Sequence, residues 1–338
     1  MRSRLTEKDE DKSRGVSPKP GGSLQAQPTD DRQIDVAILM CTFNGAAYLQ
    51  EQLESFCDQS FEHWTLYVSD DASTDATRSI LADYQQRWGE SRLKIFSGPC
   101  QGFAKNFISL LKRPEVQARY YAFSDQDDVW FSDKLERSVA HLVTVADETP
   151  ALYCSRTRLV DAKRNAAGFS PLFSRPPSFQ NALVQSLAGA NTMMINQSAR
   201  DVLLQLPDDA KVVAHDWLAY LLITACGGTA IYDAQASLDY RQHGSNLIGA
   251  NASFKDRLTR FRKMLSGRFV EWNDANLQIL RAMSPLITQE SRATLEHFEN
   301  GRRLGAKSRL CELRKSGVYR QTVGGNISLV IAAFVARI

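Results

Sequence analysis

The feature that most constrains the fold is a regular alternation of short apolar segments with longer amphipathic ones. The first apolar segment, Val36 to Cys41, has the length and unbroken hydrophobicity of a strand buried on both faces of a parallel sheet. Leu49, Leu53 and Phe56 then recur at helical spacing. Further strand-like segments, each followed by a helical pattern, lie at residues 64–68, 93–96 and 120–123. Four alternations within about 110 residues predict an α/β fold with a parallel sheet and helices on both faces.

The fourth of these helices is expected to begin after Ser132, which is a suitable N-cap. The chain beyond it is less regular. Its clearest elements are a helix-like segment at 182–187, an apolar helical run after Asp216 and a helix from Phe254. These patterns predict one α/β domain over residues 34–250 and a basic, mainly helical C-terminal extension over residues 251–338.

Residues 1–33 differ in composition from the rest of the chain. They contain seven basic and six acidic residues and almost no large apolar side chains. Such a segment buries too little apolar surface to offset the entropy of ordering, so a disordered tail is expected. No apolar core follows these charges as in a secretory signal, and the apolar run Ile327 to Val335 is about half the roughly 20 residues that span a bilayer. The expected location is therefore the cytoplasm.

The six cysteines are far apart in the sequence, and no two have the spacing of a zinc ribbon or a redox dithiol. They are Cys41, Cys57, Cys100, Cys154, Cys226 and Cys311. We expect them to be reduced and mostly buried, as small hydrophobic residues are in a cytosolic protein.

The net charge of +3 comes from 41 basic and 38 acidic residues, a balance too even to indicate a nucleic-acid partner. The positive charge is regional, because residues 254–320 contain 15 basic and 7 acidic residues. Two interpretations of these basic helices stay open. They form a solvated face, or they dock peripherally on the anionic inner face of a membrane, which an apolar stripe beneath the basic residues would permit.

Polar loops follow three of the predicted strands, at residues 42–45, 70–75 and 125–128. In parallel sheets, ligands bind at the carboxyl ends of the strands. Asp125 and Asp127 lie two residues apart and can face one hard divalent cation, which prefers oxygen ligands. Three carboxylates in four residues would repel one another without a cation. The alternative is a plain strand-end turn in which Asp128 or Ser132 caps the next helix.

Three other residues are candidates for chemistry, each with a structural alternative. Asp70, the first acid after its strand, is expected to hydrogen-bond the base or ribose of a ligand, although acids at such a position also favour a helix N-terminus. Asp216 stands beside an apolar helical run, where a general base acquires a raised pKa, or it is the N-cap of that helix. His243, within Arg241 to Gly244, suits a diphosphate or a metal, or it is a hydrogen-bonded loop histidine.

Several common motifs are missing from the sequence. It contains no G-x-G-x-x-G, G-x-x-x-x-G-K-[ST], H-E-x-x-H or G-x-S-x-G. Their absence argues against dinucleotide oxidoreductases, P-loop NTPases, zincins and α/β-hydrolases.

The order of the motifs resembles that of the inverting family-2 glycosyltransferases with a GT-A fold, most closely their bacterial rhamnosyltransferase-like branch. The matching segments are CTFNG at 41–45, EQL at 51–53, SDDASTD at 69–75, FSDQDDVW at 123–130, HDW at 215–217 and YRQHG at 240–244. They cover about residues 35–249. Phe43 stands where tyrosine is common in that family, and Ala72 where glycine is common, so the turn after Asp71 is expected to differ.

The resemblance implies a Rossmann-like GT-A domain and assigns a role to each matching residue. The expected donor-nucleotide site comprises Thr42, Phe43, Asn44, Asp70 and Asp125. The expected ligands of a divalent metal, Mg²⁺ or Mn²⁺, are Asp125, Asp127 and His243. Asp216 is the expected catalytic base. The residues expected near the diphosphate or the acceptor are Asp128, Trp130, Gly189, His215, Trp217 and Arg241.

Together, the residues and the resemblance predict a metal-dependent inverting glycosyltransferase that uses a nucleoside diphosphate sugar, with dTDP-rhamnose as the suggested donor. Its acceptor is expected to be a glycan or a lipid-linked glycan in cell-surface polysaccharide synthesis. Two alternatives stay open: a non-catalytic homologue that binds sugar nucleotides or glycans, and a phosphoryl-transfer enzyme that uses Asp125-x-Asp127. Phosphoryl-transfer enzymes of that type place the motif after their first strand, whereas three predicted strands precede it here.

Overall fold

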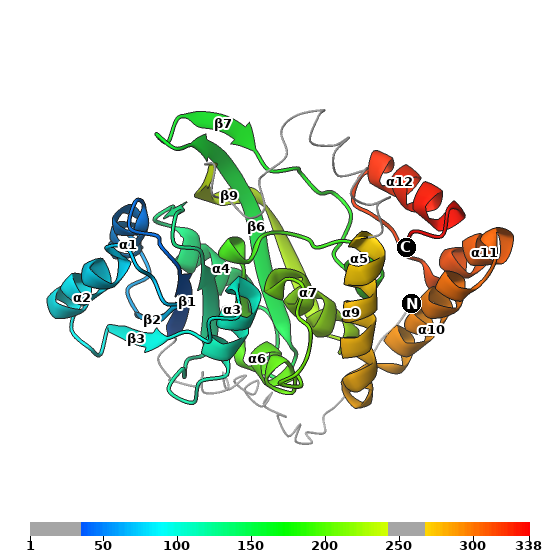
Figure 1. Ribbon diagram of the computed structural model, residues 1–338, viewed down its shortest axis with the longest axis horizontal. Coiled ribbons are helices and arrows are strands. Elements are labelled where there is room, and N and C mark those ends of the chain that lie inside the picture. The colour runs from blue at the N-terminus through cyan, green and yellow to red at the C-terminus, as the bar shows by residue number, and fades with distance from the viewer. Residues whose placement is uncertain (1–34, 243–267) are drawn as a thin grey trace, which may run out of the picture. The chain divides into compact units, whose positions relative to one another are not determined.

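The N-terminal half of the fold is an alternation of strands and helices. The computed structural model describes residues 35–242 and 268–338 (Figure 1). Its first elements are β1 Val36–Thr42, α1 Leu49–Cys57, β2 Trp64–Asp70, α2 Thr77–Trp88, β3 Leu93–Ser97, α3 Phe103–Leu111, β4 Tyr120–Ser124 and α4 Lys134–Leu142. The four predicted strands and the four predicted helices are confirmed, and their ends differ by a few residues.

The sheet extends beyond these four strands. The others are β5 Val129–Trp130, β6 Ala151–Asp161, β7 Ala166–Phe169, β8 Met194–Asn196 and β9 Thr229–Gln242. Within the described residues the strand order is β3-β2-β1-β4-β8-β6-β9-β5, and β7 pairs with β6. β1 is parallel to β2 and β4, but β8 is antiparallel to both β4 and β6. The parallel sheet predicted for the four alternations is therefore confirmed for β1 to β4. The strands that follow make the sheet as a whole mixed.

Side chains of β1 alternate between two hydrophobic cores. Ala37 and Leu39 belong to the core that also contains side chains of α3 and of the later helix α7 His215–Ala225. Val36, Ile38 and Met40 belong to the core that contains side chains of α1, α2 and α4. Because helices cover both faces, no residue of the strand is exposed, which explains its unbroken hydrophobic sequence.

The remaining helices follow from residue 179 onward. They are α5 Phe179–Ala182, η1 Ala190–Thr192, α6 Gln197–Leu204, α9 Arg268–Ala282, η2 Ser284–Leu286, α10 Gln289–Arg303, α11 Ala306–Ser316 and α12 Val323–Phe334. α9 packs on α7, where the rings of Trp217 and Phe269 stack with centroids 6.3 Å apart. The guanidinium of Arg320 donates hydrogen bonds to the carbonyl of Val184. The described residues consequently form one compact unit.

Some sequence predictions lie outside the described residues. The predicted tail over residues 1–33, the boundary near residue 250 and the helix expected from Phe254 all fall there, and they stay predictions. The structure bears on membrane insertion only through the helices that it describes. Within residues 35–242 and 268–338, none is both long enough and apolar enough to cross a bilayer.

Three local predictions are wrong. The N-cap of α4 is Asp133, with no side-chain hydrogen bond, because Ser132 still belongs to the turn after β5. The helix expected at 182–187 is the short α5, which ends at Ala182. All six cysteines are free as predicted, but only Cys154 is buried; Cys57, Cys100 and Cys311 are exposed.

The turn that joins α7 to β9 leaves no space for a side chain at Gly228. A Cβ atom there would lie 2.4 Å from the carbonyl oxygen of Pro150 and 2.7 Å from that of Ile223, whereas one at Gly324 would meet no atom within 4 Å. We predict that Gly228→Ala lowers the free energy of unfolding by about 1–3 kcal/mol, measured by urea denaturation. The matched control Gly324→Ala should leave stability unchanged or raise it by up to about 1 kcal/mol. Equal stability of the two variants would contradict the tight turn.

Candidate active site

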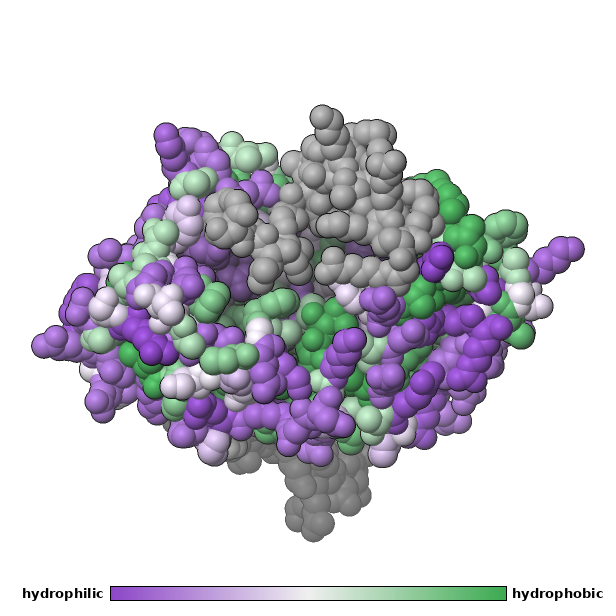
Figure 2. All heavy atoms as spheres, viewed as in Figure 1, coloured by the Kyte–Doolittle hydropathy of each residue, from purple (hydrophilic) through white to green (hydrophobic). Residues whose placement is uncertain are grey.

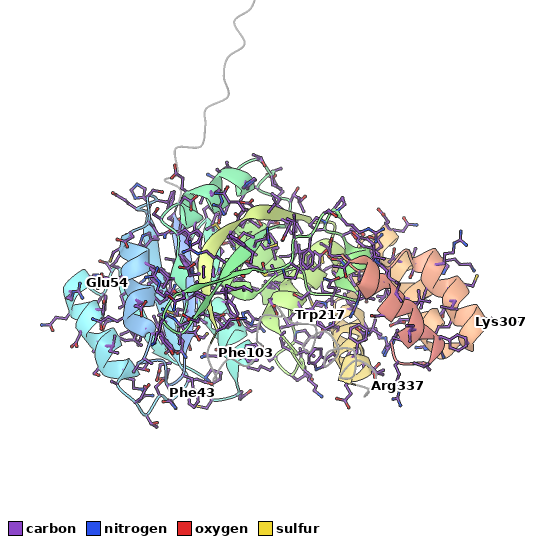
Figure 3. The ribbon with its side chains drawn as sticks, turned by 90° about the horizontal axis from the view of Figure 1, so that it is seen from above. Phe43, Glu54, Phe103, Trp217, Lys307 and Arg337 are labelled. Carbon is purple, nitrogen blue, oxygen red and sulfur yellow. The ribbon has the colours of Figure 1, made fainter. Side chains whose placement is uncertain are left out.

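The candidate site lies where β1, β2 and β4 end side by side. Thr42 and Asp70 are register partners at the ends of β1 and β2, and Met40 pairs with Ser124 at the end of β4. The three polar loops predicted from the sequence therefore start from one edge of the sheet. Phe43, in the first loop, is 58% exposed. Figure 3 shows it near the same edge of the view as Phe103 of α3.

Asp70 braces the loop that follows β2. Its carboxylate accepts hydrogen bonds from the hydroxyl of Thr42 at 2.9 Å, from the amide and hydroxyl of Ser73 at 3.0 and 2.5 Å, and from Nε of Arg78 at 2.7 Å. Burial by itself would raise the pKa of Asp70, but these hydrogen bonds hold that pKa below its ordinary value. Four bonds fill about all the lone-pair positions of a carboxylate. A contact between Asp70 and a nucleotide stays a prediction, and it would require one of these partners to give way.

The first and second loops are joined by hydrogen bonds. The amide of Asn44 donates to the hydroxyl of Ser73 at 2.9 Å, and the side-chain oxygen of Asn44 accepts from the amide of Thr74 at 2.8 Å. Asn44 and Ala72 adopt left-handed conformations, with φ of 48° and 66°. The expectation that alanine would change the turn after Asp71 is therefore wrong, because Ala72 keeps the conformation that glycine adopts easily.

Gln126 connects the first loop, residues 42–45, to the loop at residues 125–128, named here the acidic loop. Its amide oxygen accepts from the backbone N–H of Phe43 at 2.9 Å, and its amide nitrogen donates to the carbonyl of Phe43 at 3.1 Å. The side chain passes over Gly45, where a Cβ atom would lie 2.2 Å from the Gln126 amide oxygen. The sequence motif assigns no role to Gln126, which stands between Asp125 and Asp127. The sequence indicated this contact only in that Gly45 and Gln126 both stand within the matched motifs.

Asp125, Asp127 and Asp216 concentrate negative charge at the end of β4. Burial, followed by the charges of Asp127 and Asp216, raises the pKa of Asp125 to about 7. Within the described ranges, no group of three His, Cys, Asp or Glu side chains is arranged to hold a metal, and His243 lies outside those ranges. Asp125 and Asp127 nevertheless supply oxygen donors whose repulsion a cation would relieve. The pair fits a hard divalent cation such as Mg²⁺ or Mn²⁺.

Asp128 belongs to the scaffold of this loop. It is fully buried, and its carboxylate accepts from Nδ2 of Asn191 at 2.5 Å and from the amide of Arg241 at 3.4 Å. Burial, with the charges of Asp125 and Asp127, raises its pKa well above the ordinary value. Asp128 has no exposed carboxylate oxygen with which to make the predicted contact with a diphosphate or an acceptor. The alternative that it caps the next helix is also wrong, since its partners lie on β9 and η1.

Arg241 is hydrogen-bonded to the acidic loop from within the protein. Its guanidinium is 2% exposed and donates to the carbonyl of Asp127 at 3.0 Å, to that of Ala162 at 2.9 Å and to the carboxylate of Glu51 at 2.9 Å. Next to Glu51 on α1, Gln52 donates to the hydroxyl of Ser124 at 3.0 Å. These contacts explain the EQL segment of the matched motifs. They also place Arg241 within the protein, where it positions the backbone of Asp127.

Asp216 lies in the first turn of α7, after the N-cap Ala214, so the N-cap alternative is wrong. The carboxylate accepts from the amide of Trp217 at 2.7 Å and from the hydroxyl of Ser186 at 3.4 Å. Burial raises the pKa of Asp216 to about 6 despite these hydrogen bonds. Its charge also raises the pKa of Asp125, so the two acids lie close enough to interact. A half-buried carboxylate with this pKa is suited to general-base catalysis near neutral pH.

His215 lies inside an aromatic cluster. It is 5% exposed, and its ring stacks on that of Phe107 with centroids 4.1 Å apart, with Phe103 and Phe123 at 5.9 and 5.8 Å. Among the residues described, neither ring nitrogen has a hydrogen-bond partner. Burial lowers the pKa of His215 to about 3. The imidazole is therefore neutral and packs as an aromatic side chain.

The other residues expected near the acceptor are mostly internal. Trp217 is buried and donates from Nε1 to the carbonyl of Ala182 at 2.7 Å. Trp130 is buried edge-to-face against Phe56 with ring centroids 4.7 Å apart. Gly189 lies just before η1, where a Cβ atom would come within 2.7 Å of the side-chain oxygen of Asn191. Gly189 is linked to the acidic loop through the contact of Asn191 with Asp128.

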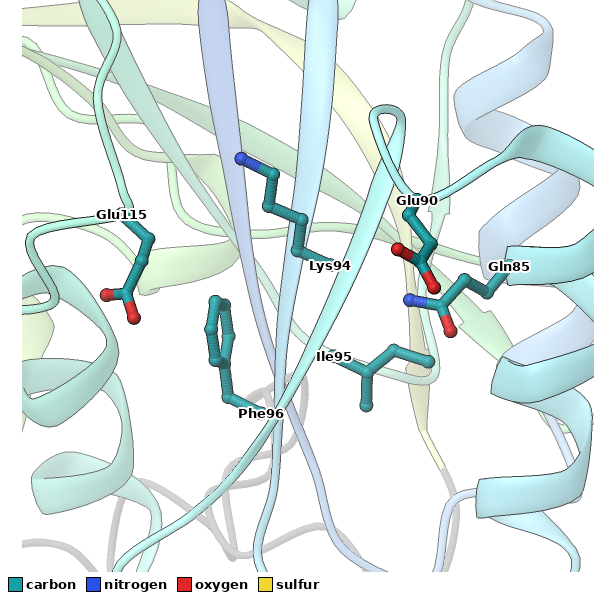
Figure 4. Close-up of a pocket in the computed structure, with 6 residues that line it drawn as sticks. All are labelled: Gln85, Glu90, Lys94, Ile95, Phe96 and Glu115. Carbon is teal, nitrogen blue, oxygen red and sulfur yellow. The ribbon is translucent and has the colours of Figure 1, made fainter.

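A separate hollow of about 410 Å³ lies along the edge strand β3 (Figure 4). Its lining consists of Gln85, Glu90, Lys94, Ile95, Phe96 and Glu115. None of the candidate residues lines it. We therefore locate the site at the loops that follow β1, β2 and β4.

Comparisons with known proteins show which family this chain belongs to. A family model described as Glycosyl transferase family 2 matches residues 37–201. The chain is 30% identical to dTDP-rhamnosyl transferase RfbG of Shigella flexneri over 234 residues, which cover 65% of this chain and 77% of that protein. It is 29% identical to UDP-Glc:alpha-D-GlcNAc-diphosphoundecaprenol beta-1,3-glucosyltransferase WfgD of Escherichia coli over 109 residues, 32% of this chain and 41% of that protein.

A solved structure has the same fold. The crystal structure of residues 1–349 of S. aureus TarS in complex with UDP-GlcNAc aligns with a TM-score of 0.50 at 16% identity, over 85% of this chain and 93% of that chain. This likeness confirms the GT-A fold predicted from the sequence.

Replacing His215 should make the protein less sensitive to acid. The imidazole has a pKa near 6.5 when unfolded and about 3 when folded, so unfolding takes up a proton and the free energy of unfolding falls as pH falls through this window. Between pH 7 and pH 5 this linkage removes about 2 kcal/mol. His215→Phe, which keeps an aromatic ring, should abolish that part of the loss in urea unfolding at the two pH values.

The matched control is His63→Phe at an exposed position, which retains His215 and should keep the wild-type loss. An identical pH dependence in the wild type and in His215→Phe would contradict a neutral, buried His215.

Proposed function

Because the chain belongs to glycosyl transferase family 2, we propose that it is an inverting glycosyltransferase that moves a sugar from a nucleoside diphosphate to a hydroxyl of a glycan or lipid-linked acceptor. The observation that carries this proposal is the position of Asp216, which follows His215 packed on Phe123 near the end of β4 and lies close enough to Asp125 for its charge to raise the pKa of that acid. It provides a single base opposite a pair of cation-binding carboxylates.

The chemistry assigned to Asp216 is removal of the acceptor proton. The acceptor oxygen attacks the anomeric carbon, the bond from that carbon to the diphosphate oxygen breaks, and the diphosphate leaves with the electron pair. The proton of the hydroxyl passes to the carboxylate of Asp216, whose hydrogen bonds from Ser186 and Trp217 fix its orientation. One base and one displacement invert the anomeric centre.

Asp125 and Asp127 are the residues that would hold a divalent cation, with His243 as a proposed third ligand. When bound, such a cation acts as a Lewis acid on the leaving diphosphate. The chain itself positions the two acids. Arg241 fixes the backbone of Asp127, and Gln126 ties the loop to Phe43. The half-buried setting also strengthens any charge interaction made there.

The loops after β1 and β2 are assigned to the donor nucleotide. Phe43 presents an exposed ring beside Asn44, a surface suited to stacking on a base. Thr42 and Asp70 shape this loop through their mutual hydrogen bond. We assign dTDP-rhamnose as the donor because the Shigella relative is named as a dTDP-rhamnosyl transferase.

The acceptor and the location follow from the same relatives. The Escherichia coli relative is named for a diphosphoundecaprenol-linked acceptor. We assign a lipid-linked glycan acceptor in cell-surface polysaccharide synthesis, and with it a cytoplasmic, membrane-peripheral location. No nucleic acid is part of this proposal.

Replacing the proposed base tests the catalytic assignment. Asp216→Asn should reduce sugar transfer from dTDP-rhamnose by about 10²–10⁴-fold, since the amide cannot accept the acceptor proton. Donor binding, followed by thermal shift, should be retained. Asp83→Asn, on the exposed face of α2, is the matched control and should transfer sugar at the wild-type rate. Full activity of Asp216→Asn would show that this residue is not the base.

Replacing Asp127 tests the proposed metal site. With Mn²⁺ and a nucleoside diphosphate at about 100 times their dissociation constants, the wild type should gain about 2.7 kcal/mol of stability. Asp127→Asn should lose most of the metal-dependent part of this gain. Asp128→Asn should keep it, because this side chain is fully buried, away from the proposed cation, and its one amide oxygen still accepts from Asn191. If Asp128→Asn lost the metal-dependent gain and Asp127→Asn kept it, the assignment of the metal to Asp125 and Asp127 would be wrong.

A further inference from the structure

The last helix, α12, presents most of its large apolar side chains to solvent. The exposed fractions are 79% for Val323, 57% for Ile327, 55% for Val330, 40% for Ile331 and 64% for Phe334. At about 100° per residue these five positions fall within a single arc of roughly 100°. They form one stripe, named here the α12 stripe. In Figure 2 the surface at the position of α12 is hydrophobic.

The opposite face of α12 is packed on the protein. Leu329, Ala332 and Ala333 are buried there, so only one large apolar side chain faces inward while five face outward. This is the reverse of what a surface helix needs for stability alone. An outward stripe of this kind, on one side of a single helix, is typical of a site that binds an apolar partner.

The α12 stripe belongs to a helix that is held at both ends. Thr322 caps the first turn by accepting from the amide of Gly325 at 3.0 Å. Near the other end, Arg309 donates to the carbonyl of Ala333 at 2.7 Å, and Arg302 donates to that of Ile338 at 2.8 Å. The stripe is therefore presented in a fixed orientation.

The surroundings of the stripe are strongly basic. Residues 301–338 contain eight Lys and Arg and one acidic residue, Glu312. Five of the basic side chains are exposed: Arg303, Lys307, Arg314, Lys315 and Arg337. Figure 3 shows Lys307 and Arg337 at the end of the molecule formed by the C-terminal helices. An apolar stripe among unbalanced positive charges matches an anionic lipid surface, in which acyl chains lie beneath negative headgroups.

We propose that α12 docks in the plane of an anionic phospholipid bilayer, with the α12 stripe buried at the level of the acyl chains. Twelve residues of helix extend about 18 Å, which is too short to cross a hydrocarbon core of about 30 Å. A second copy of this chain fits less well, because a symmetric contact would bring the same basic surface against itself. This inference deepens the proposed function by placing the enzyme where a lipid-linked acceptor is located.

The test is sedimentation of the full chain with vesicles of phosphatidylcholine, with or without about one third phosphatidylglycerol. The wild type should bind the anionic vesicles at least about tenfold more tightly, and about 0.5 M salt should weaken that binding. The double variant Ile327→Ser/Phe334→Ser should lose at least about tenfold in affinity. Phe169→Ser/Leu172→Ser is the matched control, since it removes two exposed apolar side chains elsewhere and should bind as the wild type does.

Several outcomes would overturn the proposal. Equal binding to both vesicle types would do so, as would equal losses in the two double variants. A wild type that is dimeric and does not bind vesicles, together with a monomeric Ile327→Ser/Phe334→Ser variant, would show that the α12 stripe binds a second copy of the chain. Donor hydrolysis in solution, measured on the same variants, should stay at the wild-type level. A chain that binds vesicles but never transfers or hydrolyses a sugar nucleotide would contradict the proposed function and leave the docking inference standing.

Discussion

Repulsion among the carboxylates at the end of β4 is the interaction on which the rest of the site depends. Burial, followed by the charges of Asp127 and Asp216, raises the pKa of Asp125 to about 7, and burial raises the pKa of Asp216 to about 6. The fold holds the acidic loop in place through contacts outside the site: Arg241 behind the loop, Gln52 beneath Ser124 and Gln126 across to Phe43. A cation would relieve the repulsion and would also offset the negative charge of a diphosphate, so the same arrangement favours binding of a donor together with a cation.

The sequence was sufficient for the features that depend on local pattern. The continuous apolar run of β1 and the helical spacing in α1 followed from burial on one or both faces, and both elements formed as predicted. Because ligands bind at the carboxyl ends of parallel strands, the loops with Thr42, Asp70 and Asp125 were expected at one edge of the sheet, and they start there. Asp216 was identified as a candidate base from an acid next to an apolar run, and burial does raise its pKa.

What the sequence did not predict depends on contacts between distant parts of the chain. Arg241 lies 190 residues from Glu51, and only the path of β9 through the sheet makes them partners. Trp130 and Trp217 stand within matched motifs, yet both are buried, because a motif does not tell whether a side chain of its strand or helix faces the core. The antiparallel strand β8, three residues long, is too short to give a periodic signal. The outward stripe of α12 was visible only as an apolar run, since its exposure depends on how α11 and α12 pack.

The central claim is that Asp125 and Asp127 hold a divalent cation against the donor diphosphate, facing Asp216. Anomalous diffraction from crystals grown with Mn²⁺ and a nucleoside diphosphate would test it most directly. The account predicts one strong peak with oxygens of Asp125 and Asp127 at about 2.0–2.6 Å and diphosphate oxygens completing its shell. A diphosphate bound at these loops without Mn²⁺ at the two carboxylates, or Mn²⁺ bound at another place, would contradict it.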